Sequence, residues 1–260
     1  MENLYPLFER NRILKKELLW SLRDYSFGHL QEEYRNYADG ILRGCQVRVD
    51  GRELAVSSGM VKHRGFLYLI SGEMRIGYKP TEQMEVLKLR LEEDRRSEDY
   101  ILYRITLFLD RHREKKEGEL EVCRFKLRHG SVLRDRYKDF QDMATEFDTI
   151  QVVEADFAGP EGRSLPVAVT DYFARLVLTE NSSRPEDISF AYLCLNRDTP
   201  VRREILEHYV ASRSGHGRDR ERKRSRRELF EGLVRILEDI RGSRSIRVEG
   251  TAGKRQILVD

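Results

Sequence analysis

The feature that most constrains this chain is a change in the period of its apolar residues near residue 44. Before that point, apolar residues recur about every three to four positions, as on one face of a helix. After it they alternate with polar residues, as in strands that bury one face. Cys45, Val47 and Val49 begin the alternation, and Asp50-Gly51 supplies a hairpin turn signal before it resumes. A β-module is therefore expected to follow a helical start.

Strand-like runs continue to residue 127, separated by glycines and charged segments. Phe66–Ile70 is apolar throughout, which is typical of a strand buried on both faces. We expect charged connectors at residues 92–99 and 110–118. Roughly five to seven short strands with short turns between residues 44 and 128 predict an antiparallel sandwich or roll. The strand-like runs are 45–49, 54–56, 66–70, 86–91, 100–109 and 120–127.

Helices are expected on both sides of this module. Residues 10–25 carry apolar side chains near the helical period, Gly28 is expected to end this helix, and residues 31–42 predict a second, short one. After residue 130 the apolar spacing becomes helical again. The expected C-terminal elements are helices over 167–178, 199–209 (with Thr199 as N-cap) and 228–241, and a terminal hairpin formed by 246–248 and 257–259.

The predicted fold class is α+β, with an N-terminal helix, an antiparallel β-sandwich or roll module, and a mainly helical C-terminal region that ends in a β-hairpin. A chain of 260 residues is long enough to bury a substantial core. The expected units are an N-terminal helical segment (1–43), the antiparallel β-module (44–128), a mixed linker and helical region (129–198) and a basic helical region with the terminal hairpin (199–260).

Composition and segment lengths exclude several classes of protein. Charged residues make up 36% of the chain, and the three cysteines lie far apart without CxxC spacing, so a disulfide framework or zinc ribbon is not expected. The longest uncharged apolar stretch, Phe66–Ile70, is too short to span a bilayer, and the N-terminus lacks the basic-then-apolar layout of a signal peptide. We expect a folded, heavily charged protein without membrane insertion, made in a reducing cytoplasm.

Motifs that carry chemistry are absent or incomplete in the sequence. Gly253-Lys254 lacks the upstream glycine and the following hydroxyl residue of a phosphate-binding loop, which argues against an ATPase. The six histidines show neither HExxH nor HxH spacing, and Cys45, Cys123 and Cys194 lie in apolar or strand-like contexts that favour inert, buried thiols. Acidic pairs such as Glu186-Asp187 leave a glycosidase or two-metal site open, because sequence does not give their separation in space. We expect no catalytic residue, cofactor or metal ion.

The most conspicuous charged feature is residues 213–227, where eight Arg or Lys accompany only Asp219 and Glu221. Clustered cations release counterions from nucleic acid, so one interpretation is an arm that contacts phosphates. The interpretation we favour is a solvated connector, or an arginine-rich helix start that docks on an acidic protein surface. The rest of the chain is net acidic, and no aromatic residue interleaves the run to support base stacking.

Three stretches at the start of the β-module share a recognisable layout. They are residues 39–47 (DGILRGCQV), 54–62 (LAVSSGMVK) and 65–68 (GFLY). This layout resembles the N-terminal module of phage tail and baseplate proteins, in which "G-I-x-x-G" leads into a strand, a turn, a second strand and a "G-x-x-x-x-x-G" element. Glycines allow the tight corners of a compact β-module that docks on a neighbouring subunit.

The chain as a whole is similar to a family of prophage-encoded proteins of Gram-positive gut bacteria, from contractile tails or tailocin-like particles. Residues 3–20 (NLYPLFERNRILKKELLW), 120–127 (LEVCRFKL) and 137–140 (YKDF) carry this resemblance, which covers most of residues 1–175. Some members carry a helicase label, which the missing nucleotide-binding loop contradicts. The shared motifs consist of glycine and apolar spacing and include no catalytic residues.

The resemblance implies a non-enzymatic structural subunit of a phage tail or phage-tail-like contractile particle, associated with the baseplate and acting through protein–protein assembly. Its expected partners are other tail or baseplate subunits and further copies of itself within the particle. It would lie in the bacterial cytoplasm during assembly and in the particle at maturity. The residues expected to contact partners are Leu14, Leu18, Trp20, Leu22, Arg218, Arg220, Arg222, Lys223, Arg224, Arg226 and Arg227.

Two alternatives from other classes stay open. One is a nucleic-acid-binding accessory protein that uses residues 213–227 and binds with a steep salt dependence. The other is a carbohydrate-binding β-module at a tail tip, for which Tyr100 and Tyr103 are the first aromatic candidates.

Overall fold

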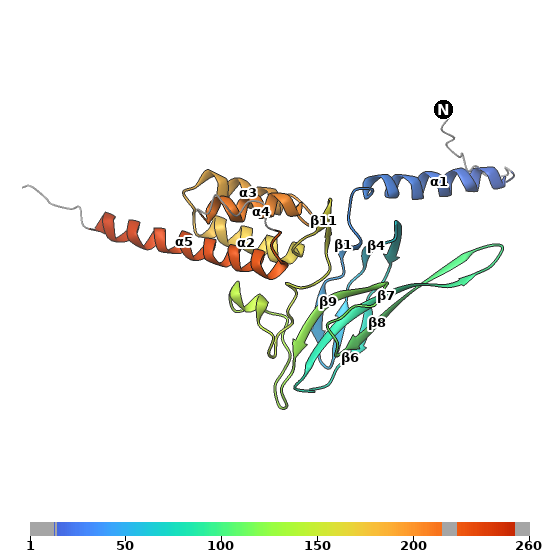
Figure 1. Cartoon of the computed structure of the whole chain (residues 1–260), viewed down its shortest axis with the longest axis horizontal. Helices are drawn as coiled ribbons and strands as arrows, with labels where there is room; N and C mark the ends of the chain where they lie inside the picture. The colour runs from blue at the N-terminus through green and yellow to red at the C-terminus, as the bar shows by residue number, and fades with distance from the viewer. Residues whose placement is uncertain (1–12, 14, 215–222, 253–260) are drawn as a thin grey trace, which may run out of the picture.

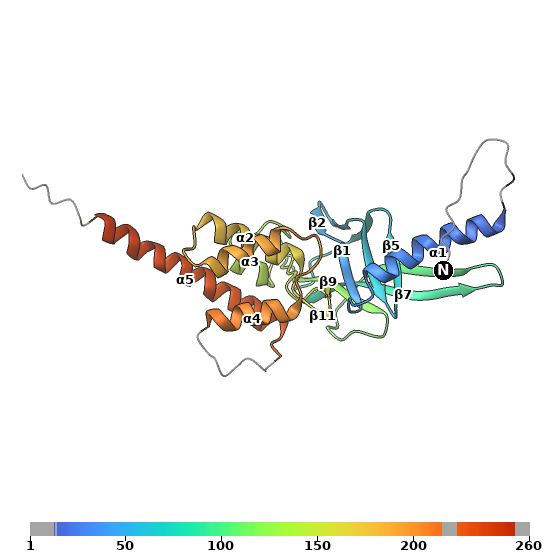
Figure 2. The same ribbon diagram turned by 90° about the horizontal axis from the view of Figure 1, so that it is seen from above.

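The computed structural model describes residue 13, residues 15–214 and residues 223–252 of the chain, with side chains described as far as residue 242. Figure 1 shows an elongated molecule with a β-rich half and a helical half, and with a helix and a long hairpin projecting from the β-rich end. Seen from above in Figure 2, both projections extend away from the helical half. The mixed α+β class predicted from the sequence is confirmed.

The first helix, α1 (Lys16–Glu33), is longer than expected. It runs through Gly28, so the predicted stop at this residue is wrong, because a single glycine weakens a helix by only about 1 kcal/mol. The second helix predicted over 31–42 is also wrong, since the chain leaves α1 and enters strand β1 (Gly40–Gly44). Ile41 is fully buried in this strand, and burial against the sheet overrides the local helical spacing.

The nine strands of the β-module form three antiparallel sheets of three strands each, with the orders β1-β4-β5, β2-β3-β6 and β8-β7-β9. Every predicted strand run overlaps an observed strand, and the predicted antiparallel pairing is confirmed. The strands after β1 are β2 (Val47–Asp50), β3 (Glu53–Val56), β4 (Gly59–His63), β5 (Phe66–Ile70), β6 (Met74–Gly77), β7 (Met84–Arg96), β8 (Ile101–Asp110) and β9 (Glu119–Lys126).

Two glycines bring the ends of β1 and β4 into close contact. Gly44 has a φ of +67°, and a Cβ there would lie 2.2 Å from the carbonyl oxygen of Ser58. A Cβ at Gly59 would lie 2.6 Å from Cys45 Sγ. Only glycine fits at either position, which explains the glycine spacing of this stretch.

Two expectations about the strands need correction. Strand β5 is not buried on both faces: Tyr68 and Ile70 pack into the hydrophobic cluster of the β-module, but Leu69 points to the other face and is 68% exposed. Residues 92–96, expected to belong to a charged connector, continue β7 and pair with β8. The side chains of these five residues are all charged and exposed. Main-chain hydrogen bonds to β8 therefore hold this part of the strand.

The helical half packs four α-helices of the described chain around one hydrophobic cluster. The helix predicted over 167–178 is confirmed as α2 (Val167–Thr179), and the one predicted over 228–241 lies within α5 (Arg226–Ala252). The buried residues of α5 follow the predicted amphipathic spacing and include Leu229, Phe230, Leu233, Leu237 and Ile240. The other elements are η1 (Gln141–Ala144), β10 (Ala158–Gly159), β11 (Gly162–Arg163), α3 (Pro185–Leu195) and α4 (Arg203–Arg213).

Several C-terminal expectations differ from the structure. Helix α3 has no counterpart among the predicted elements, and α4 begins at Arg203 instead of residue 199. Thr199 does not cap it, since its hydroxyl lies 3.4 Å from Tyr37 Oη. Residues 246–248, predicted as the first strand of the terminal hairpin, lie in α5, because a short β-branched run does not stop a helix that is already propagating. The second predicted strand, 257–259, lies outside the described residues.

The core consists of two large hydrophobic clusters. One fills the β-module, and the other fills the helical half. Residues 129–198 contribute to both, with Leu133 and Ile150 in the first cluster and Phe140 and Val153 in the second. This segment therefore connects the two halves through apolar packing as well as through the chain, while the division into four units stays a prediction.

Candidate assembly surfaces and a buried charged junction

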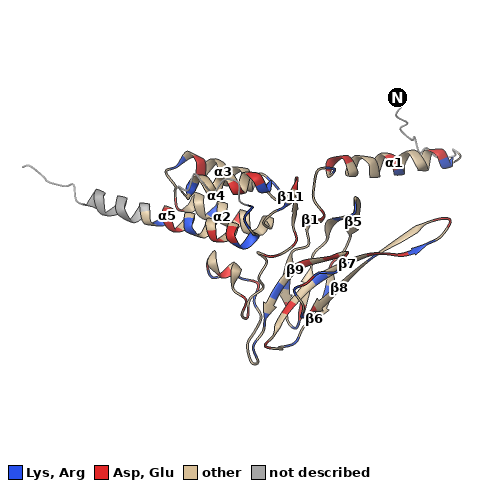
Figure 3. Ribbon diagram, viewed as in Figure 1, with Lys and Arg blue, Asp and Glu red and all other residues tan. Residues whose placement is uncertain are grey.

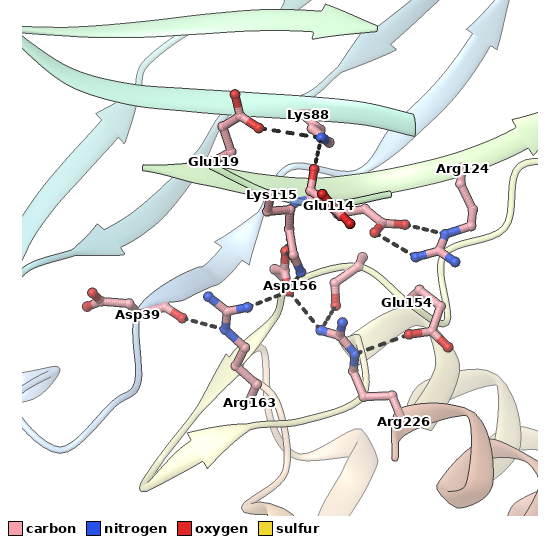
Figure 4. Close-up of polar contacts among 12 residues, drawn as sticks. Asp39, Lys88, Glu114, Lys115, Glu119, Arg124, Glu154, Asp156, Arg163 and Arg226 are labelled. Atoms are coloured by element: carbon pink, nitrogen blue, oxygen red, sulfur yellow. Dashed lines mark hydrogen bonds and ion pairs between the residues drawn. The ribbon is translucent and has the colours of Figure 1, made fainter. Parts of the chain in front are cut away.

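A buried carboxylate, that of Asp156, joins the two halves of the molecule (Figure 4). It is fully buried and contacts Lys115 Nζ at 2.7 Å, Arg163 Nη1 at 2.8 Å and Arg226 Nη1 at 3.1 Å. The backbone N–H of Glu121 donates a further hydrogen bond to it at 2.8 Å. Burial alone would raise the pKa of Asp156, but Arg163, Arg226 and Lys115 hold it below the ordinary value. Asp156 is therefore an ionised centre with its charge compensated.

The cations of this junction come from elements that are far apart in the sequence. Lys115 lies between β8 and β9, Arg163 belongs to β11, and Arg226 is the first residue of α5. Arg163 Nε donates to the main-chain oxygen of Asp39 at 3.1 Å, and Arg226 Nη1 donates to that of Ala155 at 2.8 Å. Removing one member of such a buried group leaves the other charges uncompensated, which is strongly destabilising. The junction fixes the helical half to the β-module.

A second group of buried charges lies in the β8-β7-β9 sheet. Lys88 is fully buried, and its Nζ lies 2.8 Å from Asp110 Oδ2 and 3.4 Å from Glu119 Oε2. Arg90 pairs with Glu119 at 2.9 Å. Hydrogen bonds from Lys88 and from the backbone of His112 hold the pKa of Asp110 well below its usual range. These charges compensate one another within the sheet.

The N-terminal contact residues predicted from the sequence belong to α1 and the residues before it. Leu14 lies outside the described residues, Leu18 is half-buried, and Trp20 and Leu22 are 49% and 44% exposed. Lys16 Nζ lies 5.1 Å from the centre of the Trp20 ring, a cation–π contact within the helix. No residue of α1 is buried, although all of the helix is described. This exposed apolar surface makes α1 a candidate for contact with another molecule.

The basic contact residues predicted in the segment 213–227 differ in exposure and in their partners. Lys223 is exposed, and the main-chain oxygen of Arg224 accepts a hydrogen bond from α4. Arg226 belongs to the Asp156 junction, and Arg227 pairs with Glu231 at 2.9 Å. The structure does not bring these residues together with α1, which projects from the opposite half (Figure 1). The residues of this group outside the described chain are Arg218, Arg220 and Arg222.

Sequence reasoning misses the end of the β7–β8 hairpin as a candidate contact surface. Tyr100, Ile101 and Leu102 are 52%, 36% and 42% exposed there, where the two strands extend beyond β9. The signal was three successive apolar residues after a charged run. Tyr103, the other carbohydrate candidate, is half-buried and stacks on Phe66 with ring centres 3.9 Å apart, so only Tyr100 of the two offers an exposed ring.

A cavity of about 1000 Å³ lies between the β-module and the start of α2. Met60, Leu69 and Val167 contribute to its apolar lining, and Asp171 of α2 lines it as well. Asp171 Oδ1 is buried and has no hydrogen-bond partner in the described structure, and burial raises the pKa of this carboxyl. The lining residues include no histidine that could act as a base toward a nucleophile.

The cysteine thiols in the described part of the chain are buried. Cys45, Cys123 and Cys194 are buried and unpaired, as expected, and burial raises the pKa of Cys45 and of Cys194 to about 12. Within the described residues, no three His, Cys, Asp or Glu side chains are grouped to hold a metal ion. None of the helices described here is both long enough and apolar enough to cross a membrane.

No protein-family model matches the sequence, and no curated protein matches it. Among solved structures, a chain of the TssK-TssF-TssG baseplate subcomplex of the type VI secretion system is similar over 91% of this chain and 100% of its own, with 11% identity and a TM-score of 0.41. A crystal structure of TssK is similar over 94% and 72%, with 9% identity and a TM-score of 0.37. A chain of the type VI secretion baseplate complex is similar over 92% and 70%, with 13% identity and a TM-score of 0.39. Scores of this size record a likeness in the arrangement of elements without establishing a common fold.

Proposed function

We propose that this chain is a structural subunit of a phage tail or phage-tail-like contractile particle, associated with its baseplate, and that it acts by protein–protein assembly without catalysis. The observation that carries the proposal is α1, an 18-residue helix with no buried residue. Helices of this length draw most of their stability from packing an apolar face. The large apolar side chains that α1 exposes are Leu19, Trp20, Leu22, Tyr25 and Phe27, which are between 44% and 70% exposed.

The size of this apolar surface makes association favourable. Full burial of one large apolar side chain contributes roughly 1.5–3 kcal/mol, so covering several on α1 outweighs the cost of ordering them. The end of the β7–β8 hairpin adds Tyr100, Ile101 and Leu102 at the same end of the molecule (Figures 1 and 2). Two projecting elements with exposed apolar residues suit a subunit that contacts neighbours at a distance from its own body.

The sequence supports the same proposal independently of these surfaces. The stretches that resemble phage tail and baseplate modules correspond to β1, β3, β4 and β5, and the glycine corner at Gly44 and Gly59 lies within them. We base the proposal on α1 and on this resemblance. The similar solved structures are baseplate proteins as well. The partners we propose are other tail or baseplate subunits and further copies of this chain, in the bacterial cytoplasm during assembly and in the particle at maturity.

The part of the basic segment that the structure describes gives no support to the nucleic-acid alternative. Of the basic segment, Arg213 Nη2 pairs with Asp239 at 2.7 Å, Arg226 pairs with Asp156, and Arg227 pairs with a glutamate of its own helix. Guanidinium groups in such pairs are not free to neutralise phosphates. A filter-binding assay at two salt concentrations addresses this alternative directly.

Removal of α1 tests the proposal. A chain that lacks residues 1–28 keeps Leu30, which packs beside the buried Tyr34, so its body should fold as before. We expect this chain to be lost from tail-like particles purified from the host, while a variant with Val132→Ser and Tyr192→Ser, two exposed apolar residues elsewhere, is retained. Retention of the truncated chain at the level of the full chain would contradict the proposal, as would absence of the full chain from such particles.

A further inference from the structure

Helix α1 has two apolar faces that differ in charge. Leu18, Leu22 and Tyr25 are spaced by four and three residues, so they form a continuous neutral stripe along one face. Tyr25 is 70% exposed and Leu22 44% exposed. The opposite face carries Trp20 and Phe27, and Arg23, which pairs with Asp24, lies between them at the same spacing. The neutral stripe, here called the Leu18 stripe, has the spacing of a helix–helix seam.

The charges at the ends of α1 oppose the dipole of the helix. Lys15 and Lys16 lie at the N-terminus, where the dipole is positive, and Glu32 and Glu33 lie at the C-terminus, where it is negative (Figure 3). No side chain caps the N-terminus, the last turn has no basic residue, and only Glu17 in the first turn has the favourable sign. Arg35, just beyond the helix, already pairs with Glu32 at 2.6 Å, so a neighbour of opposite charge would act on Lys15 and Lys16 at one end and on Glu33 at the other.

We infer that α1 of a second copy of this chain covers the Leu18 stripe, packed antiparallel to the first. Lys15 and Glu33 are 18 residues, or about five helical turns, apart, so both flank the stripe on the same side. In an antiparallel pair with twofold symmetry, Lys15 of each copy lies beside Glu33 of the other. A parallel pair would gather both Lys15 residues at one end and both Glu33 residues at the other, so no opposite charges would meet across the seam. The inference rests on the proposed function in treating α1 as an assembly surface, and it names the partner.

The antiparallel arrangement also satisfies the dipole of each helix. The glutamate from the second copy lies near the N-terminus of the first helix, and the lysine lies near its C-terminus. Exposed ion pairs contribute little free energy and are screened by salt, so the charges select the direction of packing, while the Leu18 stripe supplies the attraction. A contact through one helix from each copy is small compared with stable dimer interfaces, so we expect a dimer that dissociates on dilution.

Disulfide trapping tests the direction of packing. Cys45, Cys123 and Cys194 are buried, so cysteines introduced on α1 are the reactive ones. When a Lys15→Cys chain is mixed with a Glu33→Cys chain under mild oxidation, we expect the mixed disulfide dimer to form and the dimer of Lys15→Cys with itself to be absent. A Lys15→Cys dimer as the main product, or no cross-link between the two chains, would overturn the inference.

Sedimentation equilibrium tests the surface. We expect Leu22→Glu to weaken the dimer about tenfold or more, while Trp20→Glu on the opposite face leaves the dissociation constant unchanged. Lys15→Glu and Glu33→Lys should each weaken the dimer at low salt, and the double variant should restore it. Circular dichroism should show both Leu22→Glu and Trp20→Glu folded, since no residue of α1 is buried.

Two outcomes of this measurement would overturn the inference. They are a monomer at every concentration up to about 1 mM, and a dimer that Leu22→Glu leaves intact. A monomeric chain that still enters tail-like particles would overturn this inference alone and leave the proposed function in place. If the chain forms this dimer but is never found in such particles, the proposed function is overturned and the inference about the dimer stands.

Discussion

Asp156 and Lys88 are fully buried charges, whereas Trp20 and Tyr25 are large rings that face solvent. Both arrangements cost free energy unless a partner is supplied. The chain itself supplies the partners for the charges, through Lys115, Arg163 and Arg226 at the first and through acidic residues at the second. Among the described residues, the contact that we find for these rings is that of Lys16 with Trp20. At the residue scale, the fold itself therefore compensates the buried charges, and the exposed rings are the residues that the proposed assembly would cover.

The first residue-scale prediction concerns Asp156. Substitution Asp156→Asn removes the anion that Lys115, Arg163 and Arg226 share and leaves Glu154, 3.7 Å from Arg226, as the remaining carboxylate partner of these three cations. We expect the free energy of unfolding to fall by about 3–5 kcal/mol, measured by urea denaturation. The matched control is Asp99→Asn in the exposed hairpin turn, expected to change stability by less than about 0.5 kcal/mol. Equal effects of the two substitutions would contradict the structural role of the junction.

The pH dependence of stability gives a second prediction for the same carboxylate. The pKa of Asp156 is lower in the folded chain than in the unfolded chain. Its contribution is therefore complete above the unfolded pKa of about 3.9 and is lost as the pH falls through the folded value. Denaturation midpoints measured between neutral pH and pH of about 2 should fall more steeply for the natural chain than for Asp156→Asn. Parallel curves would show that this carboxylate does not titrate as described.

A third prediction concerns the thiols. Burial raises the pKa of Cys45 and of Cys194 to about 12 and also raises that of Cys123, so thiolate is scarce at neutral pH. We expect no alkylation by iodoacetamide in the native state and alkylation of all three cysteines in denaturant, counted by mass spectrometry. Rapid native labelling of any of them would show that the thiol is accessible.

At the scale of elements, the spacing of apolar residues predicts a helix or strand correctly where those residues are buried in the fold. The alternation at β2 and β3 and the amphipathic spacing of α5 predict these elements because their apolar faces pack against a core. Residues 92–96 and 246–248 could not be predicted, since main-chain pairing decides the first and continuation of a helix decides the second. The junction at Asp156 could not be predicted either, because its charged residues lie far apart in the sequence and their spacing does not indicate which of them pair.

The β7–β8 hairpin gives an element-scale prediction. Beyond β9, residues 92–96 pair only with β8, and a two-stranded ribbon of this kind is marginally stable in water. Amide hydrogens of residues 92–96 should exchange with deuterium faster than those of residues 85–90, which lie between two strands. Equal protection in the isolated protein would mean that something in solution already covers the hairpin.

At the scale of the whole molecule, the two halves and the two projections form an elongated body (Figures 1 and 2). A compact domain of 260 residues would have a radius of gyration of roughly 18 Å. Small-angle X-ray scattering should give a larger value, with a pair-distance distribution that tails toward long distances. A value near the compact one would contradict the outward extension of α1 and of the hairpin.

The central claim is that this chain is a building block of a tail-like particle and works through the surfaces that it leaves uncovered. The most direct measurement is electron microscopy of particles purified from the host, in which this protein carries a tag that a gold-labelled antibody detects. The account predicts label at the baseplate end of the particle, and loss of that label when residues 1–28 are removed. Label absent from every tail-like assembly, while the tagged protein is present in the cell, would contradict it.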